Sequence, residues 1–125
     1  MPARRGFPKW ALSALAEGRM LGIRAGEEHR FTGIWVVVVA GRVYVRPWND
    51  KPTGWHRAFE EESVGTISIQ GREIRIRARP VRSERIHDAV DAAYAEKYHT
   101  PGSRKWVRGF SQARRRATTT ELVPR

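Results

Sequence analysis

The sequence predicts an α+β fold in which a small antiparallel β-sheet curls or closes into a barrel, with flanking helices outside it. Several short segments with strand character follow one another closely, and strand and helix do not alternate regularly as in parallel β-α-β proteins. Helical patterns occur at the start of the chain and again towards its end. The length of 125 residues is usual for one domain, so we expect residues 1–125 to form a single unit.

The first half of the chain carries the strongest β signal. A short helix is expected over residues 8–17, because Pro8 suits a first helical turn and Gly18 ends it. Residues 20–25 have strand character. Residues 34–39 are β-branched and apolar on both faces, which is typical of a strand that is covered on both sides.

The next strand, predicted over residues 42–48, has two different faces. Val43 and Val45 share the apolar face. The opposite face is both polar and aromatic and carries Arg42, Tyr44, Arg46 and Trp48. A loop over residues 49–54 then leads to a short helix, which we expect over residues 55–61.

A β-hairpin follows, and the sequence suggests its register. A two-residue turn at Gly71-Arg72 places Ile69 opposite Ile74, so that apolar side chains face each other. A turn at Gln70-Gly71 would place Ile69 opposite Arg72, and we therefore expect the first register. The residues that point away from the apolar face are then Glu73, Arg75, Arg77 and Arg79.

Two helices and a last strand are predicted for the remainder. Ser83 is a suitable N-cap for a helix over residues 84–98, whose inward positions are Ile86, Val90 and Tyr94. Ser103 can cap a second helix, whose inward stripe is Trp106, Val107 and Phe110. A strand is expected over residues 117–123. The final Leu122-Val123-Pro124-Arg125 matches a thrombin cleavage sequence, and we expect it to be native because the predicted strand runs into it.

Composition limits the classes of function. The chain has no cysteine, which excludes disulfides, thiolate metal sites and cysteine catalysis and permits a reducing cytosol, so we expect a cytoplasmic protein. The longest apolar run covers residues 34–40, far short of the ~20 residues of a membrane-spanning helix, and we expect neither a membrane partner nor a signal peptide. A formal charge of +11 favours anionic partners without choosing among them.

Cations and tryptophans alternate within one strand and the short helix after it. The cluster comprises Trp35, Arg46, Trp48, Lys51, Trp55, His56 and Arg57. An indole can stack on a planar ring and a guanidinium can bind a phosphate with two hydrogen bonds, so the cluster could hold a flat anionic ligand. The ordinary alternative is that the tryptophans fill the core and the arginines face water.

Other catalytic motifs are absent from the sequence. No histidine pair has the spacing of metal ligands, and we expect no metal site. No serine lies in the glycine frame of a nucleophile elbow, and no phosphate-binding loop of the Walker type occurs. Lys97 and Tyr98 could belong to a polar site at a helix end, although a surface lysine beside a packed tyrosine is the simpler interpretation.

Several segments in a fixed order resemble domain-of-unknown-function family 2255. They are the run from Ile34 to Val39, Tyr44-Val45-Arg46, Gly54-Trp55-His56-Arg57, the stretch from Asp91 to Tyr98, and the stretch from Ala117 to Pro124. The matches extend from about residue 30 to the end of the chain. The layout is also similar to the split β-barrels that bind flavins or deazaflavins, including the deazaflavin-dependent nitroreductases.

The resemblance implies a fold and a binding site. The fold would be a small antiparallel split β-barrel with flanking helices, of the kind that binds FMN. The residues that would line a cofactor phosphate or ring are Arg46, Trp48, Lys51, Trp55 and Arg57. Split barrels commonly pair, so the resemblance also implies a homodimer.

Three functions therefore stand beside one another. The first is an oxidoreductase that uses FMN or a deazaflavin coenzyme, in which the cofactor carries the hydride chemistry. The second is a non-catalytic split barrel that binds another small molecule or a protein. The third, which we rank last, is a nucleic-acid-binding domain that uses stacking and phosphate contacts.

Overall fold

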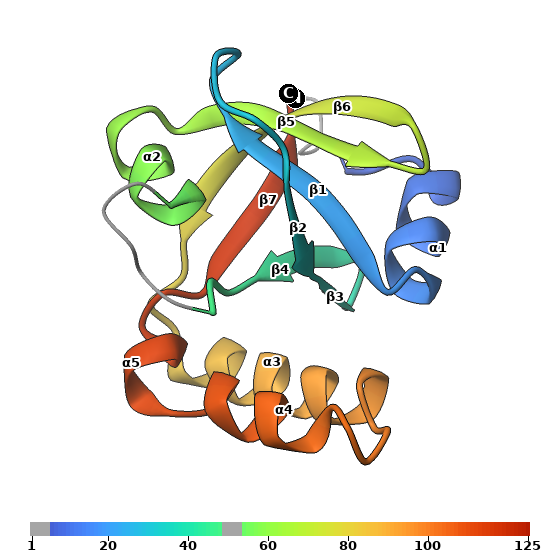
Figure 1. Cartoon of the computed structure of the whole chain (residues 1–125), viewed down its shortest axis with the longest axis vertical. Coiled ribbons are helices and arrows are strands. Elements are labelled where there is room, and N and C mark those ends of the chain that lie inside the picture. The colour runs from blue at the N-terminus through green and yellow to red at the C-terminus, as the bar shows by residue number, and fades with distance from the viewer. Residues whose placement is uncertain (1–5, 49–53) are drawn as a thin grey trace, which may run out of the picture.

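The computed structural model describes residues 6–48 and 54–125, and in these ranges seven antiparallel strands form one sheet. The strands are β1 (Met20–Ala25), β2 (Thr32–Trp35), β3 (Val37–Val39), β4 (Arg42–Val45), β5 (Val64–Ile69), β6 (Arg72–Pro80) and β7 (Thr120–Pro124). The helices are α1 (Lys9–Glu17), α2 (Trp55–Glu61), α3 (Glu84–Lys97), α4 (Arg104–Phe110) and α5 (Ala113–Arg116). Figure 1 shows the sheet curled into a nearly closed barrel, with α3, α4 and α5 together below it. The predicted α+β class, with a small antiparallel barrel and flanking helices, is confirmed.

The barrel closes through one stretch of chain that forms both of its edges. The order of the sheet is β2-β1-β5-β6-β7-β4-β3, so its two outermost strands are neighbours in sequence. Trp35 pairs with β1 and Val37 pairs with β4, and Val36 lies between the two ladders. The prediction of one strand over residues 34–39 is therefore wrong, because the backbone must change partners at Val36 to join both edges.

The interior of the barrel is apolar, as alternation along the strands predicts. Ile23, Val43, Ile67, Ile76 and Leu122 point inward and are at most 1 % exposed. Helix α1, which is confirmed, adds buried side chains to the same cluster from one end of the barrel. Full burial of such side chains stabilises the fold by about 1.5–3 kcal/mol each, and the barrel is therefore a firm support for what lies outside it.

The register predicted for the hairpin of β5 and β6 is wrong. The turn is Gln70-Gly71, and Ile69 lies opposite Arg72. A tight two-residue turn of this hand requires positive φ at both central positions, and φ is 51° at Gln70 and 80° at Gly71. The guanidinium carbon of Arg72 lies over the ring of Trp10, 3.6 Å from its centre. Trp10 of α1 thus gives Arg72 a cation–π partner outside the hairpin.

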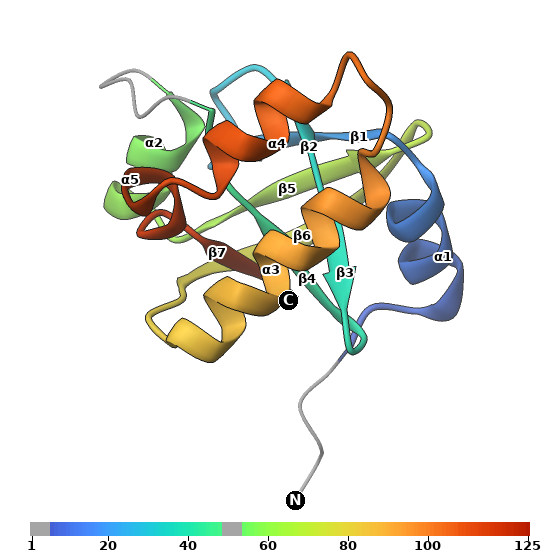
Figure 2. The ribbon, with the colours of Figure 1, turned by 90° about the horizontal axis from the view of Figure 1, so that it is seen from below.

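A second apolar cluster lies between the barrel and the helices. Tyr44 of β4, Tyr94 of α3 and Phe110 of α4 pack there, with Val37, Val81, Val90 and Tyr98. The polar and aromatic face predicted for the strand after Gly41 is thus a helix-packing face. Figure 2, seen from the side of the helices, shows α3 and α4 lying across this face.

Of the two caps predicted in the second half of the chain, the one at Ser83 is confirmed. The one at Ser103 is wrong, because its side chain makes no capping hydrogen bond and its hydroxyl accepts from Arg19 and Thr100 instead. Ser83 caps α3 by accepting a hydrogen bond from the amide of Ile86. The last strand begins at Thr120 rather than at residue 117, because the backbone amides and the hydroxyls of Thr118 and Thr119 donate to carbonyls of α5. Helix α5 itself was not predicted. Strand β7 includes residues 122–124 of the thrombin-like sequence and lies between β6 and β4.

Candidate functional site

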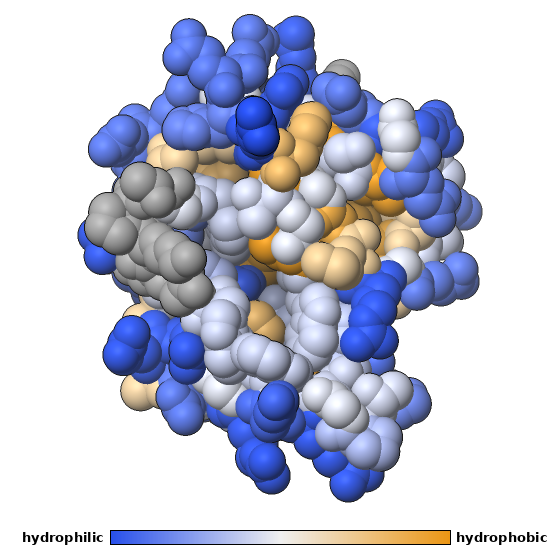
Figure 3. All heavy atoms as spheres, viewed as in Figure 1, coloured by the Kyte–Doolittle hydropathy of each residue, from blue (hydrophilic) through white to orange (hydrophobic). Residues whose placement is uncertain are grey.

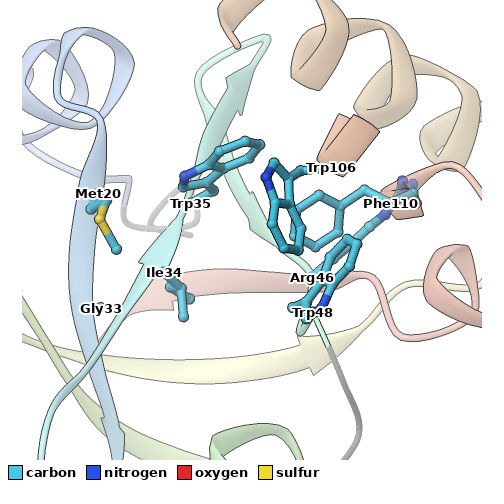
Figure 4. A pocket seen from close by; sticks show the side chains of 8 residues that line it. All are labelled: Met20, Gly33, Ile34, Trp35, Arg46, Trp48, Trp106 and Phe110. Atoms are coloured by element: carbon cyan, nitrogen blue, oxygen red, sulfur yellow. Dashed lines mark hydrogen bonds between the residues drawn. The ribbon is translucent and has the colours of Figure 1, made fainter. Parts of the chain in front are cut away.

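An aromatic pocket of about 270 Å³ opens where β2, the segment after β4 and helix α4 meet. It is lined by Met20, Gly33, Ile34, Trp35, Arg46, Trp48, Trp106 and Phe110. Figure 4 shows these side chains around a common space, and Figure 3 shows the molecule hollowed on this side between barrel and helices. Binding pockets for small molecules typically measure about 300–1,000 Å³ and have mostly apolar walls, so this pocket suits a small planar group.

The aromatic walls of the pocket are held in place by other rings. Trp35 stacks on Tyr98 with ring centres 3.9 Å apart and planes 2° from parallel. Trp48 meets Trp106 edge to face at 4.5 Å, and it meets Phe110 in the same manner at 5.4 Å. Such contacts are worth about 0.5–1.5 kcal/mol each beyond area burial. The rings therefore form a preformed slot rather than a loose surface.

The indole ring of Trp48 packs directly against the backbone of Gly109. A Cβ atom on Gly109 of α4 would lie 2.6 Å from Cη2 of Trp48, closer than real side chains come. The guanidinium of Arg115 covers the indole at 4.2 Å from its ring centre, and its Nε donates to the carbonyl of Trp48 at 2.6 Å. The position of Trp48 thus depends on α4 and α5 together.

Arg46 lines the pocket, but its guanidinium is bound within the protein. Its Nε donates to Oγ1 of Thr119 at 2.8 Å, and its Nη1 donates to Asp91 and to the carbonyl of Phe110. Its Nη2 donates to the carbonyl of His87 at 3.1 Å. Arg46 is 1 % exposed. The side chain therefore joins β4 to α3, α4 and β7, and it has little capacity left for an external phosphate.

The acidic partner of Arg46 is shared with a second arginine. Asp91 also accepts from Nη1 of Arg116 at 2.8 Å, and Arg116 further contacts Asp88 and Glu84. The hydrogen bond to Asp88 raises the pKa of Arg116. This network fixes the start of α3 against α5, which in turn carries the cation above Trp48.

The end of α3 holds the backbone at the seam of the barrel. The amide of Val36 donates to the hydroxyl of Tyr98 at 3.1 Å, and Nζ of Lys97 donates to the carbonyl of Val36 at 2.7 Å. Burial lowers the pKa of Lys97 to about 8 and raises the pKa of Tyr98 to about 12. Tyr98 is packed, as the simpler interpretation expects, but Lys97 is not a surface lysine. It is half-buried, and its ammonium group donates to the carbonyls of Leu15 and Val36.

Cations stand at the rim of the aromatic pocket. The guanidinium carbon of Arg19 lies 5.8 Å from the ring centre of Trp35, and Nζ of Lys105 lies 5.1 Å from that of Trp106. Arg115 is the third, over Trp48. These three residues, which we call the rim cations, give the apolar slot a positive border. None of them was predicted as a site residue.

The structure separates the other predicted site residues from this pocket. Trp55 lies on α2, where it lines a smaller hollow of about 190 Å³ with Arg24 and Arg30. Arg57 is exposed on the same helix, 4.0 Å from Glu60. Lys51 lies outside the described residues. Of the five predicted residues, Arg46 and Trp48 therefore share one pocket, and Trp55 and Arg57 belong to another region.

The sequence analysis missed some of the residues that line the pocket and assigned another, Trp106, to the core. Trp106 was assigned to the inward stripe of α4, but it is 39 % exposed and lines the pocket in contact with Trp48. Gly33 and Ile34 reach the pocket because β2 is an edge strand with one neighbour, β1, and Met20 reaches it from β1, where it pairs with Trp35. Half of the backbone groups of an edge strand are free to bind a ligand. For the residues that were missed, the signal in the sequence was the spacing of Trp106 and Phe110, two aromatic residues four positions apart on α4.

The fold and pocket define an antiparallel barrel protein with a helix-covered aromatic slot at the barrel seam. The chain belongs to DUF2255, described as an uncharacterized protein conserved in bacteria, whose family model matches residues 16–122. The chain is similar in fold to the crystal structure of conserved hypothetical protein Rv2991 from Mycobacterium tuberculosis. That match has a TM-score of 0.58 and 11 % sequence identity, and it covers 97 % of this chain and 83 % of the other.

Two further findings concern the class of protein. No curated protein matches the chain. Among the described helices, none has the length and apolar character needed to cross a membrane.

Proposed function

We propose that this protein binds FMN or a deazaflavin coenzyme in the aromatic pocket and acts as an oxidoreductase of nitroreductase-like type. The observation that carries the proposal is a preformed slot of three tryptophans and a phenylalanine with cations at its border. Planar anionic cofactors need both features, because the ring is bound by stacking and the phosphate by positive charge. When bound, the cofactor would supply the hydride chemistry.

The residues fit such a cofactor in a way that differs from the sequence-based expectation. Trp48 and Trp106 offer ring faces and edges for the planar part, and their apolar contacts exclude water from it. Positive charge for the phosphate comes from Arg19 and Lys105 and not from Arg46, whose guanidinium is already bound to Asp91 and three other acceptors. The guanidinium of Arg115 adds charge at the rim but already donates to Trp48, Gly109 and Gln112. No side chain in the pocket need act as acid or base.

The bound state of Arg46 favours a second candidate. If Arg46 serves only to hold the helices against the barrel, the protein is a non-catalytic module that binds a different flat molecule in the same slot. The two candidates share the pocket and differ in the ligand. We also propose, from the resemblance alone, that the protein forms a homodimer, which light scattering of the purified protein would test.

Titration of tryptophan fluorescence tests the proposal. FMN and a deazaflavin coenzyme are added separately at about 0.15 M salt, where nonspecific attraction is screened. We expect saturable quenching with one of them, which Trp106→Ala abolishes and Trp55→Ala leaves intact. The two variants form a matched pair, because Trp106 lines the aromatic pocket and Trp55 lines the hollow beside α2.

Each result has a definite meaning. Loss of binding in Trp55→Ala alone would move the site to α2, as the sequence suggested. No saturation with either cofactor at high micromolar concentration would reject the oxidoreductase and leave the non-catalytic module. If a cofactor binds, its reduced form should be reoxidised by nitroaromatic acceptors faster with the protein than without it.

A further inference from the structure

A row of arginines follows the outer face of β6, away from the aromatic pocket. Arg75, Arg77 and Arg79 alternate with inward residues and are exposed. The amide of Arg125 bonds to the carbonyl of Arg75, which brings a fourth guanidinium beside the row. We call these four residues the arginine ladder. Arg77, Arg79 and Arg125 line one shallow depression together with Val123 and Pro124.

The arginine ladder makes no ion pair in the described part of the chain, although Arg75 and Arg125 line a hollow that also contains Glu27, Glu28 and Glu62. Its four guanidinium groups form no ion pair there, whereas Arg116 contacts three carboxylates on α3. Glu121, the residue opposite Arg79, is 8 % exposed and is bound by Arg42 through two hydrogen bonds. Adjacent like charges repel and destabilise a sheet face. The depression lined by Arg77, Arg79 and Arg125 contains no acidic residue, and it is therefore suited to an external anion.

The geometry of the arginine ladder matches a chain of phosphates. Alternate residues of a strand lie about 6.7 Å apart along one face, which is comparable to the spacing of successive phosphates in an extended nucleic-acid strand. Guanidinium groups bind phosphate with two parallel hydrogen bonds. Val123 lies directly opposite Arg77 and offers apolar surface beside the cations. Unpaired bases can cover such a surface, and the stacked bases of a duplex cannot.

We propose that the arginine ladder binds the backbone of single-stranded nucleic acid without sequence preference. The surface is separate from the aromatic pocket: Figure 1 shows the end of β7 at the opposite end of the barrel from α3 to α5. The inference is therefore independent of the proposed cofactor.

Two variants of equal charge test the inference. The ladder variant carries Arg77→Gln, Arg79→Gln and Arg125→Gln. The control variant carries Lys9→Gln, Arg108→Gln and Arg114→Gln, which are exposed residues without an ion pair among the described residues. Fluorescence anisotropy with a labelled oligothymidylate of 20 nucleotides measures the dissociation constant over a series of salt concentrations.

The expected change follows from counterion release. Each phosphate contact contributes about 0.7 to the slope of log K against log salt for a single strand, so the ladder variant should lose about 2 from this slope. At about 0.1 M salt this corresponds to roughly a hundredfold weaker binding than the parent, while the control variant should lose less than about tenfold. Cofactor binding, if present, should be the same in both variants.

Three results would overturn the inference. One is an equal loss in the ladder and control variants, which would indicate attraction to net charge alone. Another is failure of the parent protein to bind the oligonucleotide at low salt. The third is equally strong competition by polyglutamate of matched charge, because carboxylates in a flexible peptide lack the regular phosphate spacing.

Discussion

Replacing Arg46 separates a structural arginine from a phosphate-binding one. In Arg46→Ala the carboxylate of Asp91 loses one partner, and the carbonyls of His87 and Phe110 lose their donors inside the protein. Removing one member of a buried ion pair costs about 3–5 kcal/mol. This is a large share of the total stability of a small domain, which is about 5–15 kcal/mol.

Urea denaturation followed by circular dichroism measures the effect. With a slope of about 2 kcal/mol/M, a loss of 4 kcal/mol lowers the midpoint by about 2 M. Arg46→Lys serves as a second variant in case the alanine variant does not fold. Lysine keeps a charge near Asp91 but cannot reach all the acceptors, so we expect a smaller loss of about 1–3 kcal/mol.

A ligand-binding arginine behaves differently, because its unpaired charge destabilises the unliganded protein. If the free energy of unfolding of Arg46→Ala lay within about 1 kcal/mol of the parent, as for an ordinary surface substitution, the structural role of Arg46 would be refuted. An increase in stability would point directly to a site for an external anion.

Three other substitutions probe the walls and the seam of the barrel. Gly109→Ala should lower the melting temperature and shift Trp48 emission, because the new Cβ atom meets the indole; a stabilised variant would contradict the packing. Tyr98→Phe should lose about 1–3 kcal/mol in urea denaturation, because the amide of Val36 is left without a partner, and an unchanged midpoint would disprove this. The unfolding free energy of the parent should rise between pH 8 and 10.5, where the folded chain has lost the Lys97 proton and the unfolded chain still holds it. Above pH 10 the raised pKa of Tyr98 acts in the opposite sense, because the unfolded chain then binds fewer protons. Lys97→Met should flatten the rise below pH 10, and the same slope in both proteins would exclude Lys97 as its source.

Signals that depend on neighbours along the chain predicted much of the fold. The cap at Ser83 and the helix at residues 55–61 are examples, because both are decided within a few residues. The register of the hairpin was predicted wrongly, because side-chain matching within the hairpin does not decide it. The turn at Gln70-Gly71 requires positive φ at both residues, and this requirement outweighed the matching of apolar side chains. Trp10, which is distant in sequence, contacts Arg72 at the position opposite Ile69.

The site depended on distant contacts and was predicted only in part. Arg46 and Trp48 line one pocket, as predicted, but they follow β4, which ends at Val45 rather than at residue 48. The partners that bind the guanidinium of Arg46 lie 41 to 73 positions away. An apolar stripe on α4 does not show which of its residues meets the core and which meets a pocket. Phe110 belongs to the second apolar cluster and also lines the pocket, whereas Trp106 lines the pocket and is 39 % exposed. Trp48 contacts both rings.

The central place of β7 has a consequence for how the protein is made. This strand joins β6 to β4, so without it the sheet consists of the group β2-β1-β5-β6 and the separate hairpin of β3 and β4. All the other strands of the sheet precede β7 in the chain, and until β7 pairs, β6 and β4 each keep an unpaired edge. Such edges attract other chains. Pairing of β7 is therefore the step of synthesis that protects the sheet from association with other chains.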